Sequence, residues 1–141
     1  MKKNICKFAI LFFVIGNGSN LFSQNSNRTR LFIIPNNQNY VNVTIFGRLI
    51  TKQFYGPPNY GETPQIDSIE THYVLQLSET ITFRQGSFTA TVGEIQLIFN
   101  NNNTGLITGR NYVIDGEAFF AETGHHHTPI IISVNRITRR D

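Results

Sequence analysis

The regular alternation of apolar and polar residues after residue 40 constrains this chain more than any other feature. Between Val41 and Ile50 the valines, isoleucine and leucine fall on every second position. A period of two is typical of a β-strand with one buried face. Such stretches predict five main strands, at residues 41–50, 71–77, 95–99, 112–121 and 130–134, with shorter β-prone pieces at 81–83 and 88–92. We therefore expect an all-β domain with at most one short helix, within residues 104–109.

Two of the predicted strands carry a glycine in their middle, Gly47 and Gly116. A glycine inside a strand commonly marks a bulge or a sharp bend, and a small closed barrel needs such bends. Three strands, a linking segment and a two-strand hairpin follow one another in the order of a five-stranded, OB-like Greek-key barrel. A small β-sandwich or a β-roll has the same periodicity, so both stay open as alternatives.

The N-terminus is predicted to be a signal peptide over residues 1–23. Lys2 and Lys3 precede an apolar run, residues 5–15, which has the length of a signal-peptide core and is too short to span a bilayer. We expect cleavage after Ser23 and export to the periplasm or the medium. Because Cys6 lies well before that bond, no lipid anchor is expected, and no membrane span remains after the signal is removed.

The predicted mature chain has three parts: a polar, Asn-rich leader at 24–40, a single domain at 41–138 and a short tail at 139–141. Roughly 118 residues are enough for one domain with its own core. The leader contains one apolar island, Leu31–Ile34, and the sequence leaves open whether it adds a strand to the sheet.

Removal of the signal also changes the charge balance. Lys2, Lys3 and Lys7 are three of the twelve basic residues, so nine basic residues face nine acidic ones in the mature chain. A strongly basic footprint is absent, and no nucleic acid partner is expected. The mature chain also lacks cysteine, which excludes disulfides and thiol chemistry.

Two polar segments between strands contain most of the groups that can bind a ligand. The first, residues 54–67, is a stiff loop with three prolines, and the second, residues 122–129, contains three consecutive histidines. In an OB barrel the loops after the first and the fourth strand flank one ligand-binding face, so we expect the two segments to be neighbours. The candidate ligand-binding residues are Tyr55, Tyr60, Glu62, Asp67, His72, His125, His126 and His127.

A metal ion is the sharpest hypothesis for this site. Alternation puts His125 and His127 on one side of an extended segment, and His72 with Glu122 could complete a nitrogen and oxygen set for zinc or copper. A histidine could instead close the turn through a backbone hydrogen bond, with Gly124 in a positive-φ conformation. A polar or anionic small molecule bound by histidine and tyrosine is the third alternative.

Two motifs also resemble a known family. Gly56-Pro57-Pro58-Asn59-Tyr60 and Thr123-Gly124-His125-His126-His127-Thr128-Pro129 resemble exported bacterial proteins known as domain of unknown function 4431. The resemblance covers about residues 41–137. It implies an OB-like fold and no activity, so it adds no catalytic role to the residues above.

Catalysis is not expected, because the mature chain has no G-x-S-x-G elbow and no cysteine. The carboxylate pairs Glu62 with Asp67 and Asp115 with Glu117 are more typical of surface residues than of an acid and a base. The sequence favours a non-catalytic binding module whose site lies between residues 54–67 and 122–129. The alternative is a structural or accessory domain in which the His-rich turn is only conformational. The partner is an unidentified small ligand, a metal ion or a protein.

Overall fold

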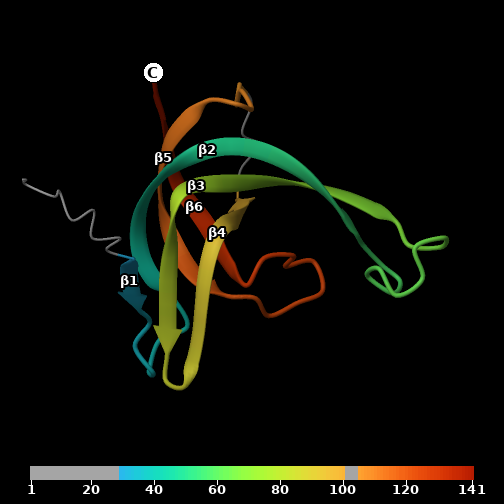
Figure 1. Cartoon of the computed structure of the whole chain (residues 1–141), viewed down its shortest axis with the longest axis horizontal. Coiled ribbons are helices and arrows are strands. Elements are labelled where there is room, and N and C mark those ends of the chain that lie inside the picture. Colours follow the sequence, from blue (N-terminus) through green and yellow to red (C-terminus); the bar gives the residue numbers. More distant parts are fainter. Residues whose placement is uncertain (1–28, 101–104) are drawn as a thin grey trace, which may run out of the picture.

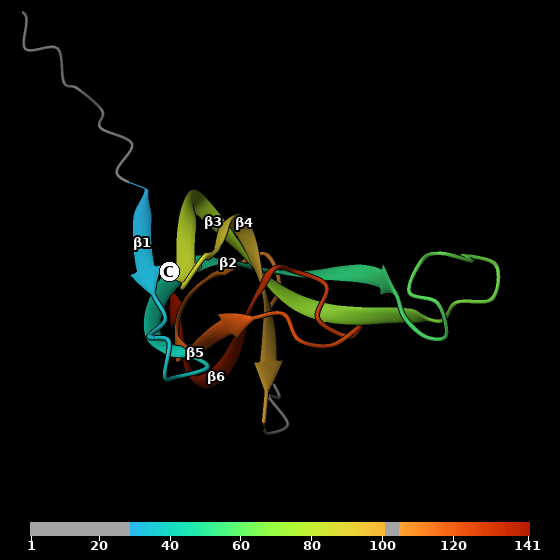
Figure 2. The same cartoon turned by 90° about the horizontal axis from the view of Figure 1, so that it is seen from below.

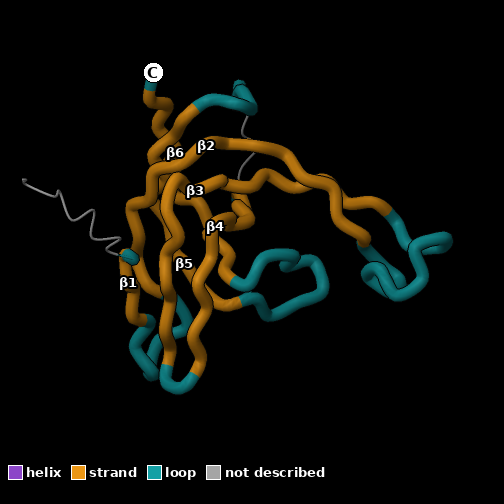
Figure 3. Tube along the Cα trace, in the orientation of Figure 1, coloured by secondary structure: helices purple, strands orange, loops and turns teal. Residues whose placement is uncertain are grey.

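The computed structural model describes residues 29–100 and 105–141, and these residues form six β-strands and no helix (Figures 1 and 3). The strands are β1 (Arg30–Ile33), β2 (Val41–Tyr55), β3 (Ile69–Gln85), β4 (Phe88–Phe99), β5 (Asn111–Phe120) and β6 (Ile130–Arg140). The sequence allows one short helix within residues 104–109, but the described residues 105–109 form turns and irregular structure.

Strands β2 to β6 close into a ring. β2 pairs antiparallel with β3 and β5, β3 pairs antiparallel with β4, and β5 pairs antiparallel with β6. The parallel pairing of β4 with β6 completes the circuit, as the view in Figure 2 shows. This is the strand order of an OB barrel. The prediction of a small all-β barrel is confirmed.

Two strands each unite two of the pieces predicted from the sequence, and β2 and β6 also extend beyond their predicted ends. The pieces at 71–77 and 81–83 belong to the single strand β3, and those at 88–92 and 95–99 belong to β4. The register between β3 and β4 shifts between Gln76 and Ile81, and the three residues between Leu77 and Ile81 are all exposed. An irregularity of this kind interrupts the alternation of faces, which is why the sequence suggested two short strands.

The barrel interior is filled by the apolar faces of the five strands. Val43, Ile45 and Leu49 of β2 are buried, whereas the intervening Thr44 and Phe46 are exposed. The rest of the core cluster comes from the other strands and includes Leu75, Phe83, Ile95, Ile114, Ala118, Ile130 and Ile132. The alternation that predicted the strands therefore also predicts which side of each strand faces inward.

The two mid-strand glycines lie where neighbouring strands approach closely. A Cβ on Gly47 would lie 2.6 Å from the carbonyl oxygen of Gln76, and a Cβ on Gly116 would overlap the carbonyl oxygen of Ser133. The β5–β6 register also shifts between Asp115 and Gly116. Both glycines allow the close backbone contacts of a tightly coiled sheet.

The apolar island in the predicted leader is β1. It pairs parallel with β3, and the ring of Phe32 stacks on that of Phe83 with centroids 5.3 Å apart. Ile34, next in the chain, is 1% exposed. Residues 30–34 therefore lie on the barrel. The predicted signal peptide lies outside the described residues, and within them no helix is long and apolar enough to cross a membrane.

Strands β2 and β3 continue beyond the ring as a two-stranded arm (Figures 1 and 2). Residues 51–55 pair with residues 69–73 along this arm, and the connecting loop, residues 56–68, forms its tip. Tyr55, expected in the loop, is thus the last residue of β2. The segment between β5 and β6, drawn in orange-red, extends from the barrel on the same side as the arm.

Candidate functional site

The loop at the tip of the arm is organised around the side chain of Asp67. Its carboxylate accepts hydrogen bonds from the backbone N–H groups of Asn59 at 2.8 Å and Gly61 at 2.7 Å. Tyr60, between these two residues, has a φ of 53°. A non-glycine residue in this left-handed region is uncommon and is held there by its surroundings. Asp67 therefore fixes the part of the loop that carries Tyr60.

The segment from 121 to 129, which we call the His turn, is closed by its own backbone and by one histidine. Ala121 N–H donates to the carbonyl of Pro129 at 3.0 Å, and Glu122 N–H donates to Nδ1 of His126 at 3.0 Å. The His126 ring lies edge-on to that of Phe119. Burial lowers the pKa of His126. His126 thus has the turn-closing role considered above and does not join the other two histidines.

The loop and the His turn meet through Tyr60. Its ring lies edge-on to that of His125, with centroids 5.6 Å apart, and its hydroxyl lies 3.4 Å from His125 Nε2. Gly124 supports the same contact, because a Cβ at this position would lie 2.6 Å from Tyr60 Cζ. The expected positive φ at Gly124 is wrong, since Gly61, Gly86, Gly105 and Gly109 are the described glycines with positive φ. The position is occupied by glycine because a tyrosine ring packs on it.

The carboxylate of Glu70, near the start of β3, is the centre of the site. Its Oε1 lies 2.7 Å from His125 Nδ1, and its Oε2 lies 2.9 Å from His127 Nε2 and 3.3 Å from His72 Nε2. We call these four residues, Glu70, His72, His125 and His127, the Glu70 cluster. The Glu70 side chain is 19% exposed and that of His127 is 10% exposed, whereas that of His125 is 55% exposed. The cluster is therefore partly buried, with His125 on its open side.

The electrostatics of the cluster strongly favour the ionised carboxylate. The hydrogen bond from His127, followed by those from His72 and His125, lowers the pKa of Glu70 to about 2, although burial acts in the opposite direction. A carboxylate that accepts several hydrogen bonds is stabilised in its charged form. A full negative charge therefore lies among three imidazole rings at neutral pH.

Gln96 of β4 holds the His turn against the barrel. Its side chain is 1% exposed, accepts a hydrogen bond from His127 N–H at 2.7 Å and donates one to the His125 carbonyl at 2.9 Å. Its amide nitrogen also lies 3.2 Å from His72 Nδ1. The Gln96 backbone N–H donates to the hydroxyl of Thr128 at 2.9 Å. One buried residue thus fixes both the backbone of the turn and the ring of His72.

An aromatic ring on the arm also helps to fix the position of the His127 side chain. Its ring stacks on that of Phe54 with centroids 4.5 Å apart and planes 2° from parallel. A groove runs beside this stack between the arm and β4, where Lys52 and Glu94 form an ion pair at 2.6 Å. His127 is therefore held by a ring on one face, by Gln96 through its backbone and by Glu70 at Nε2.

The structure brings some of the predicted site residues together and leaves others apart. His72, His125 and His127 meet at Glu70, and Tyr60 contacts His125. The other candidates lie outside the Glu70 cluster: Tyr55 lies against Gly61, Asp67 and Glu62 contribute to the loop, and Glu122 and His126 belong to the closure of the His turn.

Glu70 was missed by sequence reasoning, although a signal was available. It precedes His72 by two residues in a strand, and residues two apart in a strand share one face. The prediction placed the site in the two segments between strands, and it therefore named Glu122 of the His turn as a carboxylate ligand. The structure instead places Glu70 beside the histidines, and one potential ligand atom from each of Glu70, His72 and His127 lies within 4.8 Å of the others.

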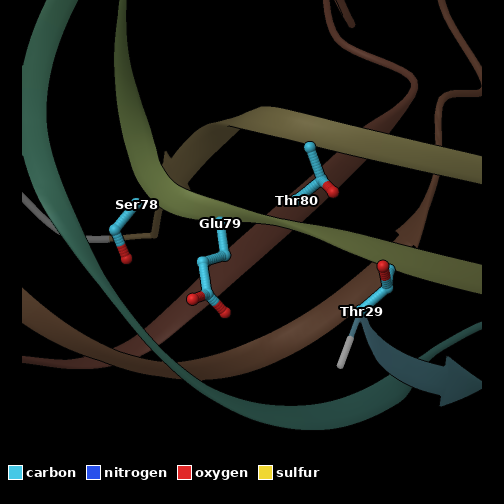
Figure 4. Close-up of a pocket in the computed structure, with 4 residues that line it drawn as sticks. All are labelled: Thr29, Ser78, Glu79 and Thr80. Atoms are coloured by element: carbon cyan, nitrogen blue, oxygen red, sulfur yellow. The ribbon is translucent and has the colours of Figure 1, made fainter. Parts of the chain in front are cut away.

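A separate hollow lies at the irregular part of β3. Ser78, Glu79 and Thr80 line it together with Thr29, as Figure 4 shows. These residues supply one carboxylate and three hydroxyl groups. Because the ionisable groups converge at the Glu70 cluster and not in this hollow, we place the candidate site at the cluster.

No curated protein and no solved structure matches this chain. Residues 94–138 match the family model described as Domain of unknown function (DUF4431). The matched residues run from β4 through β5 and the His turn into β6, whereas the Gly56–Tyr60 motif lies outside them. The predicted resemblance to domain of unknown function 4431 is thus confirmed over residues 94–138.

Proposed function

We propose that this protein is an exported, non-catalytic binding module whose ligand is a divalent transition metal ion, zinc or copper, held at the Glu70 cluster. The observation that carries the proposal is the convergence of three imidazoles, those of His72, His125 and His127, on the carboxylate of Glu70. One potential ligand atom from each of Glu70, His72 and His127 lies within 4.8 Å of the others. Imidazole nitrogens and a carboxylate oxygen are donors that zinc and copper accept.

The surroundings of the cluster support this proposal. Glu70 and His72 come from the β3 strand of the arm, and His125 and His127 come from the His turn. Gln96, Phe54 and Asp67 hold these parts without contributing a ligand atom of their own. A metal site needs such supporting contacts to hold its ligands in place. The ionised Glu70 also supplies the negative charge that attracts a cation.

Thermal unfolding of the metal-stripped mature domain, titrated with zinc, copper and nickel salts, tests the proposal. An ion that binds only the folded state raises the unfolding midpoint, and stabilises by about 2.7 kcal/mol at a hundredfold excess over Kd. The matched pair of variants is His127→Gln, which we expect to lose the shift, and His126→Gln, which we expect to keep it. No shift with any of the three ions would overturn the proposal.

Export is tested separately. The full chain is expressed in a bacterial host, and the N-terminus of the protein recovered outside the cytoplasm is sequenced. A mature N-terminus at Gln24 is expected from the predicted cleavage after Ser23. A full-length chain retained in the cytoplasm would contradict this part of the proposal.

A structural role is the second candidate, and one observation favours it. The two oxygens of Glu70 already have three imidazole partners, so the cluster can fasten the His turn to β3 without an ion. In that case Glu70→Gln destabilises the domain and metal salts leave its unfolding midpoint unchanged.

A further inference from the structure

The orientation of the Gln96 side-chain amide is fixed by two backbone groups. Its Oε1 faces the N–H of His127 at 2.7 Å, and its Nε2 faces the carbonyl of His125 at 2.9 Å. A backbone N–H can only donate and a carbonyl oxygen can only accept, so the amide fits one way round. With Gln96 1% exposed, the reversed amide would place like groups together in a buried position.

The fixed amide determines which nitrogen of His72 carries its proton. The second hydrogen of Gln96 Nε2 points to His72 Nδ1, 3.2 Å away. An amide NH₂ only donates, so His72 Nδ1 must be the acceptor, and the proton of the neutral ring lies on Nε2. That Nε2–H is directed at Glu70 Oε2, 3.3 Å away. Both ring nitrogens of His72 thus already have hydrogen-bond partners, Gln96 at Nδ1 and Glu70 at Nε2.

This arrangement is opposite to that of a metal ligand. A histidine that binds an ion through one nitrogen normally donates the N–H of the other to a carboxylate, a carbonyl or water. At His72 the nitrogen that faces the cluster carries a proton, and the other faces a donor. For His72 to ligate through Nε2, its proton would have to move to Nδ1, against the N–H of Gln96.

His125 and His127 do not have this restriction. His127 Nε2 faces Glu70 Oε2, His125 Nδ1 faces Glu70 Oε1, and the bonds from Gln96 reach only their backbone groups. The side chain of His125 is 55% exposed, so its ring lies on the open side of the cluster, between Glu70 and Tyr60. An imidazole of this kind becomes a ligand by a change of tautomer, with its proton moving to the other nitrogen.

We infer that His72 is a positioning residue and that Glu70, His125 and His127 are the metal ligands. His72 holds Glu70 Oε2 through its Nε2–H, and Gln96 holds His72 in the required tautomer. The ligand set expected from the sequence, which included His72 and Glu122, is thereby replaced by one carboxylate and two imidazoles. This inference rests on the proposed function, because it assigns roles within the same site.

Copper-loaded protein at one equivalent, examined by pulsed electron paramagnetic resonance, counts the imidazoles bound to the ion. We expect two in the wild type and two in His72→Ala, with an affinity about tenfold weaker in His72→Ala because Glu70 loses its support. His72→Gln, whose amide can still donate to Glu70, should bring the affinity back to within about threefold of wild type. His127→Gln should reduce the count to one.

The outcomes separate the two proposals. Three imidazoles in the wild type, or the loss of one in His72→Ala, overturns the assignment of His72 and leaves the metal site standing. Absence of copper binding overturns the proposed function and the ligand assignment together. Nitrogen NMR of the metal-free protein tests the tautomer alone: a protonated Nε2 and a bare Nδ1 on His72 support the assignment, and the reverse contradicts it.

Discussion

The ring of Tyr60 occupies the space that a side chain on Gly124 would need. A Cβ built on Gly124 would lie 2.6 Å from Tyr60 Cζ and within 3 Å of both neighbouring ring carbons. The two residues lie in different connections of the barrel, one after β2 and the other before β6. Their contact is what joins the tip of the arm to the His turn, and it depends on the absence of a side chain at position 124.

Replacement of Gly124 by alanine should therefore displace Tyr60 more than it destabilises the domain. The tyrosine ring is the far end of a flexible side chain and can swing away, so we expect a stability loss of no more than about 1 kcal/mol. Nuclear Overhauser contacts between the Tyr60 and His125 rings should disappear. Gly93→Ala is the control, because its new Cβ would meet nothing nearer than Thr80 Cγ2 at 4.0 Å. Unchanged ring contacts in Gly124→Ala would contradict the packing described here.

Gly116→Ala, in contrast, should destabilise the whole domain. The new Cβ would overlap the Ser133 carbonyl oxygen, which is backbone of the neighbouring strand β6 and cannot swing away. We expect a loss of about 3 kcal/mol in the free energy of unfolding, measured by urea titration, because overpacking forces backbone shifts. Gly93→Ala is again the control. A wild-type unfolding curve for Gly116→Ala would show that β5 and β6 are further apart than the structure has them.

The contribution of residues 30–34 can be measured with two adjacent isoleucines, one at the end of β1 and one just after it. Ile34 is 1% exposed and Ile33 is 58% exposed, so they differ in burial but not in chemistry. Ile34→Ala should cost about 2–5 kcal/mol through the lost burial and the cavity it leaves. Ile33→Ala should change stability by less than about 0.5 kcal/mol. Equal effects in the two variants would indicate that residues 30–34 do not lie on the barrel in solution.

Glu70 should make the metal-free domain sensitive to acid. Folding lowers the pKa of Glu70 from 4.5 to about 2. At pH values above 4.5, the pKa in the unfolded chain, the ionised carboxylate therefore stabilises the folded state, and this stabilisation is lost as the pH falls toward 2. The contribution is at most about 3 kcal/mol. In urea titrations from about pH 5 to about pH 2, Glu70→Gln should lose correspondingly less stability than the wild type. The exposed Glu62→Gln serves as the control, and equal slopes for Glu70→Gln and wild type would contradict the prediction.

Gln96→Leu should be among the most damaging conservative substitutions in the domain. Leucine leaves the N–H of His127 and the carbonyl of His125 without their partner. A buried polar group without a hydrogen bond costs about 1–3 kcal/mol, and two are affected here. Gln76→Leu, at an exposed position of β3, is the matched control. Chemical denaturation of both variants provides the measurement, and equal stabilities would show that Gln96 does not hold the His turn.

Local rules predicted the barrel well. Alternation in β2, β5 and β6 identified the strands and their inward faces, and the mid-strand glycines Gly47 and Gly116 indicated tight coiling. Local pattern failed at residues 78–80, because an irregularity in pairing is decided by the partner strand and not by the residues themselves. The local pattern also did not decide whether Leu31–Ile34 joins the sheet, because the burial of these residues depends on contacts with β3.

The site could be predicted only in part, for a similar reason. Loop geometry in an OB barrel brought His125 and His127 near His72 in the prediction. The role of Gln96 could not be foreseen, because its partners lie 24 to 31 residues away and its importance arises from complete burial. Glu70 itself could have been predicted, because it lies two residues before His72 and shares its face of the strand.

The most direct test of the central claim is an anomalous difference map at the zinc absorption edge from crystals of the mature domain grown with one equivalent of zinc. The account predicts a peak bonded to Glu70, His125 and His127, with His72 in contact with Glu70 but not with the ion. A map without a peak at Glu70, or a peak at Glu122 or another surface carboxylate in its place, would contradict it.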